Sequence, residues 1–167
     1  MFCRSRPERW LRLLLLAGGL LSAPMPVWSA PHAILPFVAD TWRELSLSSR
    51  RPMVVVFSTT DCTHCPAVID SLAASIRASR SAPRLVVVVM DGAGQEQTLR
   101  GDPHYRKANA LYAFDGDAMA LRFRVNPDWR GVTPYVALIP AVGATQFYTG
   151  APPQDALQAL LRQPGGH

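Results

Sequence analysis

Runs of apolar residues alternate with segments of mixed polarity along most of the chain. Two short runs, Met53–Phe57 and Leu85–Met90, consist almost entirely of aliphatic and β-branched residues, which is typical of strands buried on both faces of a sheet. Between them, Thr63–Ser79 repeats apolar side chains at helical spacing. Because a helix separates the two strands, we expect them to pair in parallel.

Weaker patterns complete the expected order of elements. They predict an amphipathic helix over Phe37–Leu47, a polar and irregular segment over residues 91–109, and a short strand at Ala110–Phe114. A closing hairpin would add antiparallel strands, so the expected fold is α/β, with a central mixed sheet flanked by helices. The elements predicted after residue 115 are a helix capped by Asp117 and ending at Arg124, strands at Tyr135–Ile139 and Thr145–Tyr148 joined by a turn at Gly143, and a helix over Pro152–Arg162.

The N-terminal segment has a pattern of its own. A basic region over residues 1–12 is followed by an apolar run from Leu13 to Leu21 and then by small residues around Ser29. This is the three-part pattern of a secretory signal, and the apolar run is shorter than the ~20 residues that span a bilayer. We expect a signal peptide over residues 1–29 that is cleaved after Ser29. An uncleaved N-terminal membrane anchor is the alternative.

The length of 167 residues suits one domain behind this segment. We expect a linker over residues 30–40, the domain over 41–162 and a disordered tail over 163–167. More than half of the formal charge of +5 belongs to residues 1–29, and the remainder has no basic run. This distribution argues against a nucleic acid partner. The expected location is the periplasm.

The cysteines carry the candidate chemistry. Cys3 lies in the basic region, so an exported chain would keep only Cys62 and Cys65. A disulfide between residues three apart closes almost no loop and adds little stability, so chemistry explains the pair better. The pair lies where a buried strand gives way to a helix, and a helix N-terminus favours a thiolate. We therefore expect Cys62 to attack substrate disulfides and Cys65 to resolve the mixed disulfide.

The residues around the pair modify this expectation. His64 adds a titratable cation that would stabilise the Cys62 thiolate and make the pair more oxidising. The carboxylate of Asp61 opposes that effect unless it points to solvent. An inert surface disulfide is one alternative. A metal site is another: a periplasmic metallochaperone would bind its ion through both cysteines and a distant histidine such as His104, although the histidines are scattered.

Three stretches together resemble the thioredoxin superfamily: Val54-Val55-Val56-Phe57, then Cys62-Thr63-His64-Cys65, and later Gly131-Val132-Thr133-Pro134-Tyr135. The resemblance covers nearly the whole exported part of the chain and implies a thioredoxin-like fold. It further implies that Pro134 follows a cis peptide bond and faces the disulfide, and that Thr133 offers its backbone to an extended substrate strand. No cofactor is expected, because the electrons reside in the sulfur pair.

The segment between Met90 and Asp117 and the run from Phe114 to Val125, ahead of Thr133-Pro134, look like the extra strand and helix of the exported TlpA/ResA-like group. We therefore expect a short insert between the second strand and the cis-proline region. This resemblance implies a periplasmic thiol–disulfide oxidoreductase that acts on protein thiols and disulfides. A membrane redox partner would recharge it, and a reductant's role in cytochrome c maturation or a similar process is implied. His64 is more similar to the residue found in oxidants and isomerases, so the direction of electron flow stays open.

The chain also departs from the family pattern. Asp61 stands where an aromatic residue commonly precedes the first cysteine, and Val56 stands where thioredoxins carry a buried acid that helps to move the proton of the second cysteine. Glu96 is a candidate substitute for that acid, and a solvated surface carboxylate is its alternative role. Trp129 is expected either to flank the site or to pack in the core.

Overall fold

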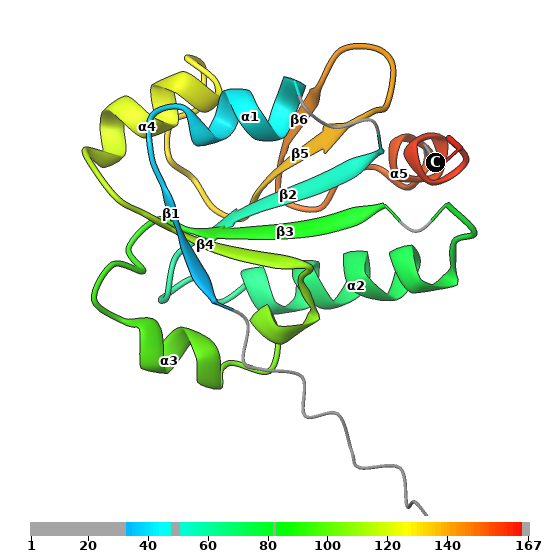
Figure 1. Cartoon of the computed structure of the whole chain (residues 1–167). Coiled ribbons are helices and arrows are strands. Elements are labelled where there is room, and N and C mark those ends of the chain that lie inside the picture. The colour runs from blue at the N-terminus through cyan, green and yellow to red at the C-terminus, as the bar shows by residue number, and fades with distance from the viewer. Residues whose placement is uncertain (1–32, 48–50, 82, 165–167) are drawn as a thin grey trace, which may run out of the picture.

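The computed structural model describes residues 33–47, 51–81 and 83–164, so the expected signal peptide over residues 1–29 lies outside the described residues. A six-stranded sheet forms the centre of the molecule (Figure 1). Its strands are β1 (Ile34–Phe37), β2 (Met53–Ser58), β3 (Arg84–Val89), β4 (Ala110–Phe114), β5 (Tyr135–Ile139) and β6 (Gln146–Thr149). Their order across the sheet is β1-β4-β3-β2-β5-β6.

Helices cover both faces of this sheet. In Figure 1, α1 and α4 lie above it, and α2 and α3 lie below it. The helices are α1 (Thr41–Leu47), α2 (Cys65–Ala78), α3 (Glu96–Gly101), the short 3₁₀ helix η1 (Tyr105–Lys107), α4 (Ala118–Val125) and α5 (Gln154–Leu161). The part of the chain that the structure describes contains no helix long and apolar enough to cross a membrane.

The two central strands separate two hydrophobic cores. Val54 and Val56 of β2 belong to the core under α2 and α5, whereas Val55 and Phe57 belong to the core under α1 and α4. Both faces of β2 are therefore buried, which explains why its sequence is continuously apolar. β2 pairs in parallel with β3 and antiparallel with β5, and β5 pairs antiparallel with β6. These pairings confirm the expected mixed sheet.

Residues 34–37 correct the expected linker over residues 30–40. They form β1, which pairs in parallel with β4 at the edge of the sheet. Phe37 is buried, with its ring centroid 5.2 Å from that of Phe114 and 6.0 Å from that of Phe57. A four-residue edge strand containing Pro36 has no readable period, because its structure depends on a partner strand far along the chain. The domain therefore includes residues 34–40, and the helix expected from Phe37 begins at Thr41.

Other boundaries lie close to those expected. The carboxylate of Asp117 accepts a hydrogen bond from the Ala120 backbone N–H at 2.7 Å, which confirms it as the cap of α4. α3, η1 and β4 lie between β3 and α4, so the expected insert is present and places one strand inside the sheet. At the C-terminus, the side-chain carbonyl of Gln163 accepts a hydrogen bond from the Ala141 backbone N–H at 2.9 Å. This first residue of the expected disordered tail is thus held in place.

Candidate functional site

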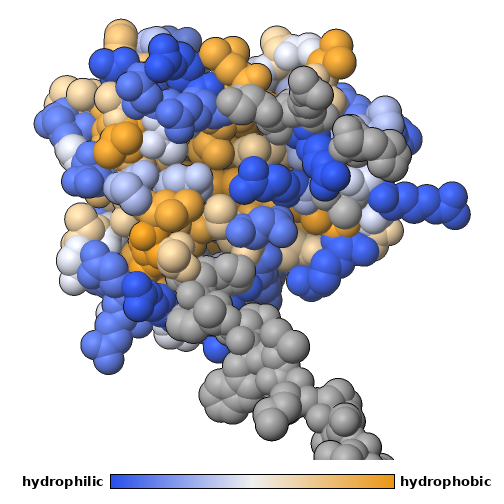
Figure 2. Space-filling model, in the orientation of Figure 1, coloured by the Kyte–Doolittle hydropathy of each residue, from blue (hydrophilic) through white to orange (hydrophobic). Residues whose placement is uncertain are grey.

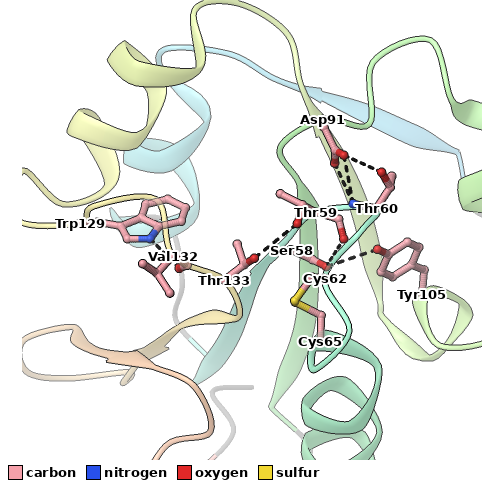
Figure 3. Close-up of a disulfide and its surroundings, with 10 residues drawn as sticks. All are labelled: Ser58, Thr59, Thr60, Cys62, Cys65, Asp91, Tyr105, Trp129, Val132 and Thr133. Atoms are coloured by element: carbon pink, nitrogen blue, oxygen red, sulfur yellow. Dashed lines mark hydrogen bonds between the residues drawn. A yellow bond between two sulfur atoms is a disulfide. The ribbon is translucent and has the colours of Figure 1, made fainter.

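Cys62 and Cys65 form a disulfide at the N-terminal end of α2, just beyond the end of β2 (Figure 3). Their Cα atoms are 5.4 Å apart, and the backbone N–H of Cys65 donates to the carbonyl of Cys62 at 3.3 Å. Cys62 is half-buried, whereas Cys65 is only 1% exposed. A dissolved disulfide can therefore approach the first sulfur far more easily than the second.

The start of α2 differs slightly from expectation. We expected Cys62 at or beside the N-cap, but the N-cap is His64 and Cys65 is the first helical residue. Pro66 follows within the first turn, where its missing N–H costs no hydrogen bond, and this favours the later start. The N-terminus of α2 thus adjoins the disulfide through Cys65. The side chains of His64 and Asp61 are both exposed. Water therefore screens the carboxylate of Asp61, which reduces its opposition to a thiolate on Cys62.

A carboxylate that the sequence analysis missed fixes the turn before Cys62. Asp91, the second residue after β3, accepts hydrogen bonds from the backbone N–H of Thr60 at 2.9 and 3.2 Å and from the Thr60 hydroxyl (Figure 3). The backbone N–H of Met90 also donates to the Ser58 carbonyl at 2.9 Å. The carboxyl ends of the parallel strands β2 and β3 meet here. The position of Asp91 directly after the strand expected at Leu85–Met90 could therefore have pointed to it from the sequence.

Two buried hydroxyls lie close to the disulfide. Ser58, at the end of β2, is fully buried, and its hydroxyl lies 3.3 Å from that of Tyr105 in η1 (Figure 3). Burial raises the pKa of Tyr105, so its phenol stays protonated at neutral pH. Val56, at the position of the family's buried acid, is fully buried among apolar residues. Glu96 is exposed and accepts a hydrogen bond from the Gly94 backbone N–H. Of its two expected roles, it therefore has that of a solvated surface carboxylate.

The loop before β5 meets the same turn. The peptide bond between Thr133 and Pro134 is cis, as the resemblance implied. The hydroxyl of Thr133 lies 3.4 Å from that of Thr59, which follows β2 and precedes Cys62 (Figure 3). The structure therefore brings the two predicted substrate-binding residues to the turn that carries the first cysteine, although Thr59 and Thr133 are 74 positions apart in the sequence.

Trp129 packs in the core and also supports this loop. Its indole ring stacks on Tyr135 with centroids 4.5 Å apart and lies 4.9 Å from the ring of Phe57. Its Nε1 donates to the carbonyl of Val132 at 3.0 Å (Figure 3). Of the two roles considered from sequence, packing is confirmed. The hydrogen bond adds a positioning role, because Val132 directly precedes Thr133.

His104, the distant histidine considered as a metal ligand, is engaged elsewhere. Its Nδ1 lies 2.9 Å from Oδ1 of Asp70 on α2, and Nζ of Lys107 lies 2.6 Å from the same oxygen. These contacts join η1 to α2. Within the described ranges, no three His, Cys, Asp or Glu side chains gather as a metal site. The arrangement of His104 therefore does not supply a third ligand to the two cysteines.

The contacts of Asp70 with Lys107 and His104 predict how the stability of the fold depends on pH. The hydrogen bond from Lys107 lowers the pKa of Asp70, burial opposes this, and His104 lowers it further. A lowered folded-state pKa stabilises the fold above the ordinary aspartate value of about 3.9, and this contribution is lost as pH falls through the folded value. The free energy of unfolding, measured by urea titration, should fall more steeply below about pH 4 in the wild type than in Asp70→Asn.

Because the Asp70 side chain is partly exposed, the free energies of unfolding of the wild type and Asp70→Asn should differ by less than about 1 kcal/mol at neutral pH. Asp115→Asn, which alters an exposed aspartate after β4, serves as the matched control and should retain the wild-type slope. Equal slopes in the wild type and in Asp70→Asn would contradict the assignment.

Comparisons with known proteins return structures alone. No family model and no curated protein matches the chain. A secreted Mycobacterium tuberculosis disulfide oxidoreductase homologous to Escherichia coli DsbE is 24% identical, with 68% of this chain and 81% of that chain covered and a TM-score of 0.46. A thioredoxin-related protein from Neisseria meningitidis serogroup B is 16% identical, with coverages of 66% and 82% and a TM-score of 0.49. DsbF of Mycobacterium tuberculosis is 21% identical, with coverages of 69% and 84% and a TM-score of 0.45.

The chain's own topology identifies its fold. A parallel β-α-β unit carries the cysteine pair at the start of its helix, and an antiparallel hairpin and a terminal helix complete the sheet. The cis-proline Pro134 directly precedes β5, the first strand of that hairpin, and lies beside the turn that carries Cys62. On these features, the described chain has a thioredoxin-like fold.

Proposed function

We propose that the protein is a thiol–disulfide oxidoreductase of the thioredoxin superfamily that exchanges electrons with protein thiols and disulfides through Cys62 and Cys65. The observation that carries this proposal is the placement of a half-buried and a fully buried sulfur at a helix N-terminus, beside a cis-proline loop. The helix N-terminus stabilises a thiolate. The difference in exposure gives the two sulfurs different tasks.

In the reducing direction, the Cys62 thiolate attacks one sulfur of a substrate disulfide. That disulfide breaks, its other sulfur leaves as a thiolate and takes a proton, and Cys62 is joined to the substrate. The Cys65 thiolate then attacks the Cys62 sulfur, which releases the second substrate thiol and forms the Cys62–Cys65 disulfide. Two electrons have passed to the substrate. The reverse sequence oxidises a substrate dithiol, and neither direction needs a cofactor.

The cis-proline loop is the proposed binding site for the substrate backbone. Thr133 and Pro134 lie next to the turn that leads to Cys62, and an extended chain adds to exposed backbone groups as an extra strand. No buried carboxylate stands at Val56 to accept the proton of the Cys65 thiol, and the Tyr105 phenol stays protonated at neutral pH, so water is the proposed proton acceptor.

The N-terminal pattern supports a periplasmic location after export through residues 1–29, with retention as a membrane anchor as the alternative. A pair that cycles between two redox states needs a partner to recharge it, and we propose a membrane redox protein for that role. A function as reductant in cytochrome c maturation or a similar process fits the proposed group. The equilibrium of the Cys62–Cys65 disulfide with glutathione measures its reduction potential and so distinguishes the two directions of electron flow. A potential of about −270 mV indicates a reductant, and one of about −120 mV indicates an oxidant.

The test of the proposed function is catalysis. The purified exported chain should reduce or oxidise a disulfide-bonded peptide faster than the same concentration of glutathione does. Thiol titration with and without a chelator separates this function from metal transport. If both thiols are masked by copper or zinc that survives purification, and no disulfide is exchanged, the proposed function is wrong.

His64 is the proposed tuner of the pair, and this gives a second prediction. In His64→Ala, loss of the imidazole two residues after Cys62 should lower the reduction potential of the disulfide by about 30 mV, a tenfold change in equilibrium constant. The equilibrium with glutathione measures it. Thr63→Ala is the matched control, because Thr63 is the other exposed residue between the cysteines. An unchanged or higher potential in His64→Ala would remove histidine from the tuning role.

A further inference from the structure

α4 presents large apolar side chains to solvent. Met119 and Phe123 are 70% and 63% exposed, and their spacing of four residues puts them on one side of the helix. Leu121 and Val125 bury the opposite side. Apolar residues reach the surface elsewhere as patches among hydrophilic ones (Figure 2), but this pair adjoins a hollow. Exposed apolar residues around a hollow are typical of a contact surface for another molecule.

The hollow combines apolar walls with positive charge. It has a volume of about 260 Å³ and is lined by Met119, Arg122, Phe123, Pro127, Trp129 and Arg130. We refer to these six residues as the α4 hollow. Its lining contains two guanidinium groups and no carboxylate. An arginine fork binds carboxylate and phosphate groups through paired hydrogen bonds, so the lining suits an acidic side chain next to a large apolar one.

The α4 hollow is continuous with the loop beside the disulfide. Trp129 lines the hollow and donates its Nε1–H to the carbonyl of Val132, one residue before Thr133. Gly131 has φ +84°, and a Cβ built on it would overlap the guanidinium of Arg122, so Arg122 lies directly against the loop. Val132 is itself 55% exposed. Trp129, Val132 and Thr133 lead towards the disulfide in Figure 3. One extended polypeptide can therefore occupy both places.

We propose that the α4 hollow binds an acidic, apolar segment of the polypeptide whose disulfide is exchanged, and so selects protein substrates with a carboxylate and a large apolar side chain a few residues from the reactive cysteine. This inference rests on the proposed function. The four residue-to-residue steps from Trp129 to Thr133 span at most about 14 Å of extended chain, so a substrate segment of similar length reaches the hollow.

An anionic membrane is a less suitable occupant than a protein segment. Asp117 lines the neighbouring surface with Met119 and Phe123, and Asp128 is exposed between two residues of the α4 hollow. A flat negative surface would meet these carboxylates together with the arginines. For a single carboxylate docked inside the hollow, the only charged groups in the lining are Arg122 and Arg130.

The experiment compares peptides that differ only beside the cysteine. Each peptide carries one cysteine as a mixed disulfide with thionitrobenzoate, which becomes coloured when the reduced protein releases it. The flanking residues are Glu and Phe, Lys and Phe, or Glu and Gly. The wild type should react with the Glu–Phe peptide about fivefold faster than with either other peptide, and added salt should reduce its advantage over the Lys–Phe peptide.

Variants of the α4 hollow should change this order. Arg130→Glu should remove or reverse the preference for Glu over Lys, and Phe123→Ser should remove the preference for Phe over Gly. Arg162→Glu and Val142→Ser, which alter exposed residues of the same types away from the hollow, should behave as the wild type. Because the salt series uses the wild type alone, the charge effect remains testable even if a hollow variant misfolds.

The outcomes separate the inference from the proposed function. The mixed disulfide of 2-mercaptoethanol with thionitrobenzoate has no flanking residue on its 2-mercaptoethanol side, so the wild type and all these variants should react with it equally. If the wild type reacts with it but treats the three peptides alike, the inference is wrong and the oxidoreductase proposal stands. If the wild type reacts with none, the oxidoreductase proposal is wrong. Equal peptide rates together with Arg130-dependent sedimentation on anionic phospholipid vesicles would overturn the protein substrate in favour of a membrane.

Discussion

Cys62→Ser is expected to lower the rate of disulfide exchange by at least about a hundredfold, because a serine hydroxyl does not ionise near neutral pH and cannot replace the attacking thiolate. Cys65→Ser should instead retain the attack and stop halfway, with the substrate still joined to Cys62. Release of a coloured thiol measures the attack, and mass spectrometry of the unreduced protein measures the trapped adduct. The two variants thus report separately on the two steps.

The exposures of the two sulfurs set the expected asymmetry. Cys62 is half-buried and Cys65 is 1% exposed, so alkylation of the reduced wild type at neutral pH should label Cys62 first. Thr63→Ala changes an exposed residue between the cysteines without removing a sulfur, and it should keep both steps. Initial labelling of Cys65, or an adduct trapped by Cys62→Ser and not by Cys65→Ser, would contradict the assignment of nucleophile and resolving thiol.

Phe57→Ala is expected to destabilise the fold more than any surface change. Phe57 is completely buried, and its ring lies between 4.9 and 6.4 Å from those of Phe37, Trp42, Trp129 and Tyr135. Loss of such a side chain removes buried apolar area and leaves a cavity, which costs about 3–5 kcal/mol of the free energy of unfolding. For a domain of this size the melting temperature should fall by about 10 °C.

Phe123→Ala provides the control for this measurement, because it removes the same atoms from a side chain that is 63% exposed. Its free energy of unfolding should stay within about 0.5 kcal/mol of the wild type. Chemical denaturation of the oxidised proteins measures both variants. A loss below about 1 kcal/mol in Phe57→Ala would mean that the aromatic cluster repacks around the missing ring.

Phe57 also connects stability with the site. Its ring contacts Trp129, which supports the carbonyl of Val132, and Val132 precedes the cis peptide bond at Thr133. The core under α1 and α4 therefore holds the loop proposed to bind substrate. On the opposite face, Asp70 joins η1 to α2 and so positions Tyr105 against Ser58. The cysteine-bearing turn is supported from both faces of the sheet.

Local features of the sequence were sufficient for the central elements. The continuous apolar runs predicted β2 and β3, because strands covered on both faces need no polar positions. Asp117 marked the start of α4, because a capping carboxylate bonds a backbone N–H only three residues away. The two cysteines marked the site for the same reason: three residues of spacing bring their sulfurs together whenever the second one opens a helix.

Contacts between distant segments were decided by the tertiary structure alone. β1 carries no readable pattern and exists because β4 pairs with it, 77 residues further along the chain. The bonds from Thr60 to Asp91 and from Ser58 to Tyr105 each depend on how the sheet orders its strands. The sequence determined which residues carry the sulfur chemistry, since that depends on neighbours along the helix. The structure determined what surrounds the sulfurs, since those groups meet only when the whole sheet is assembled.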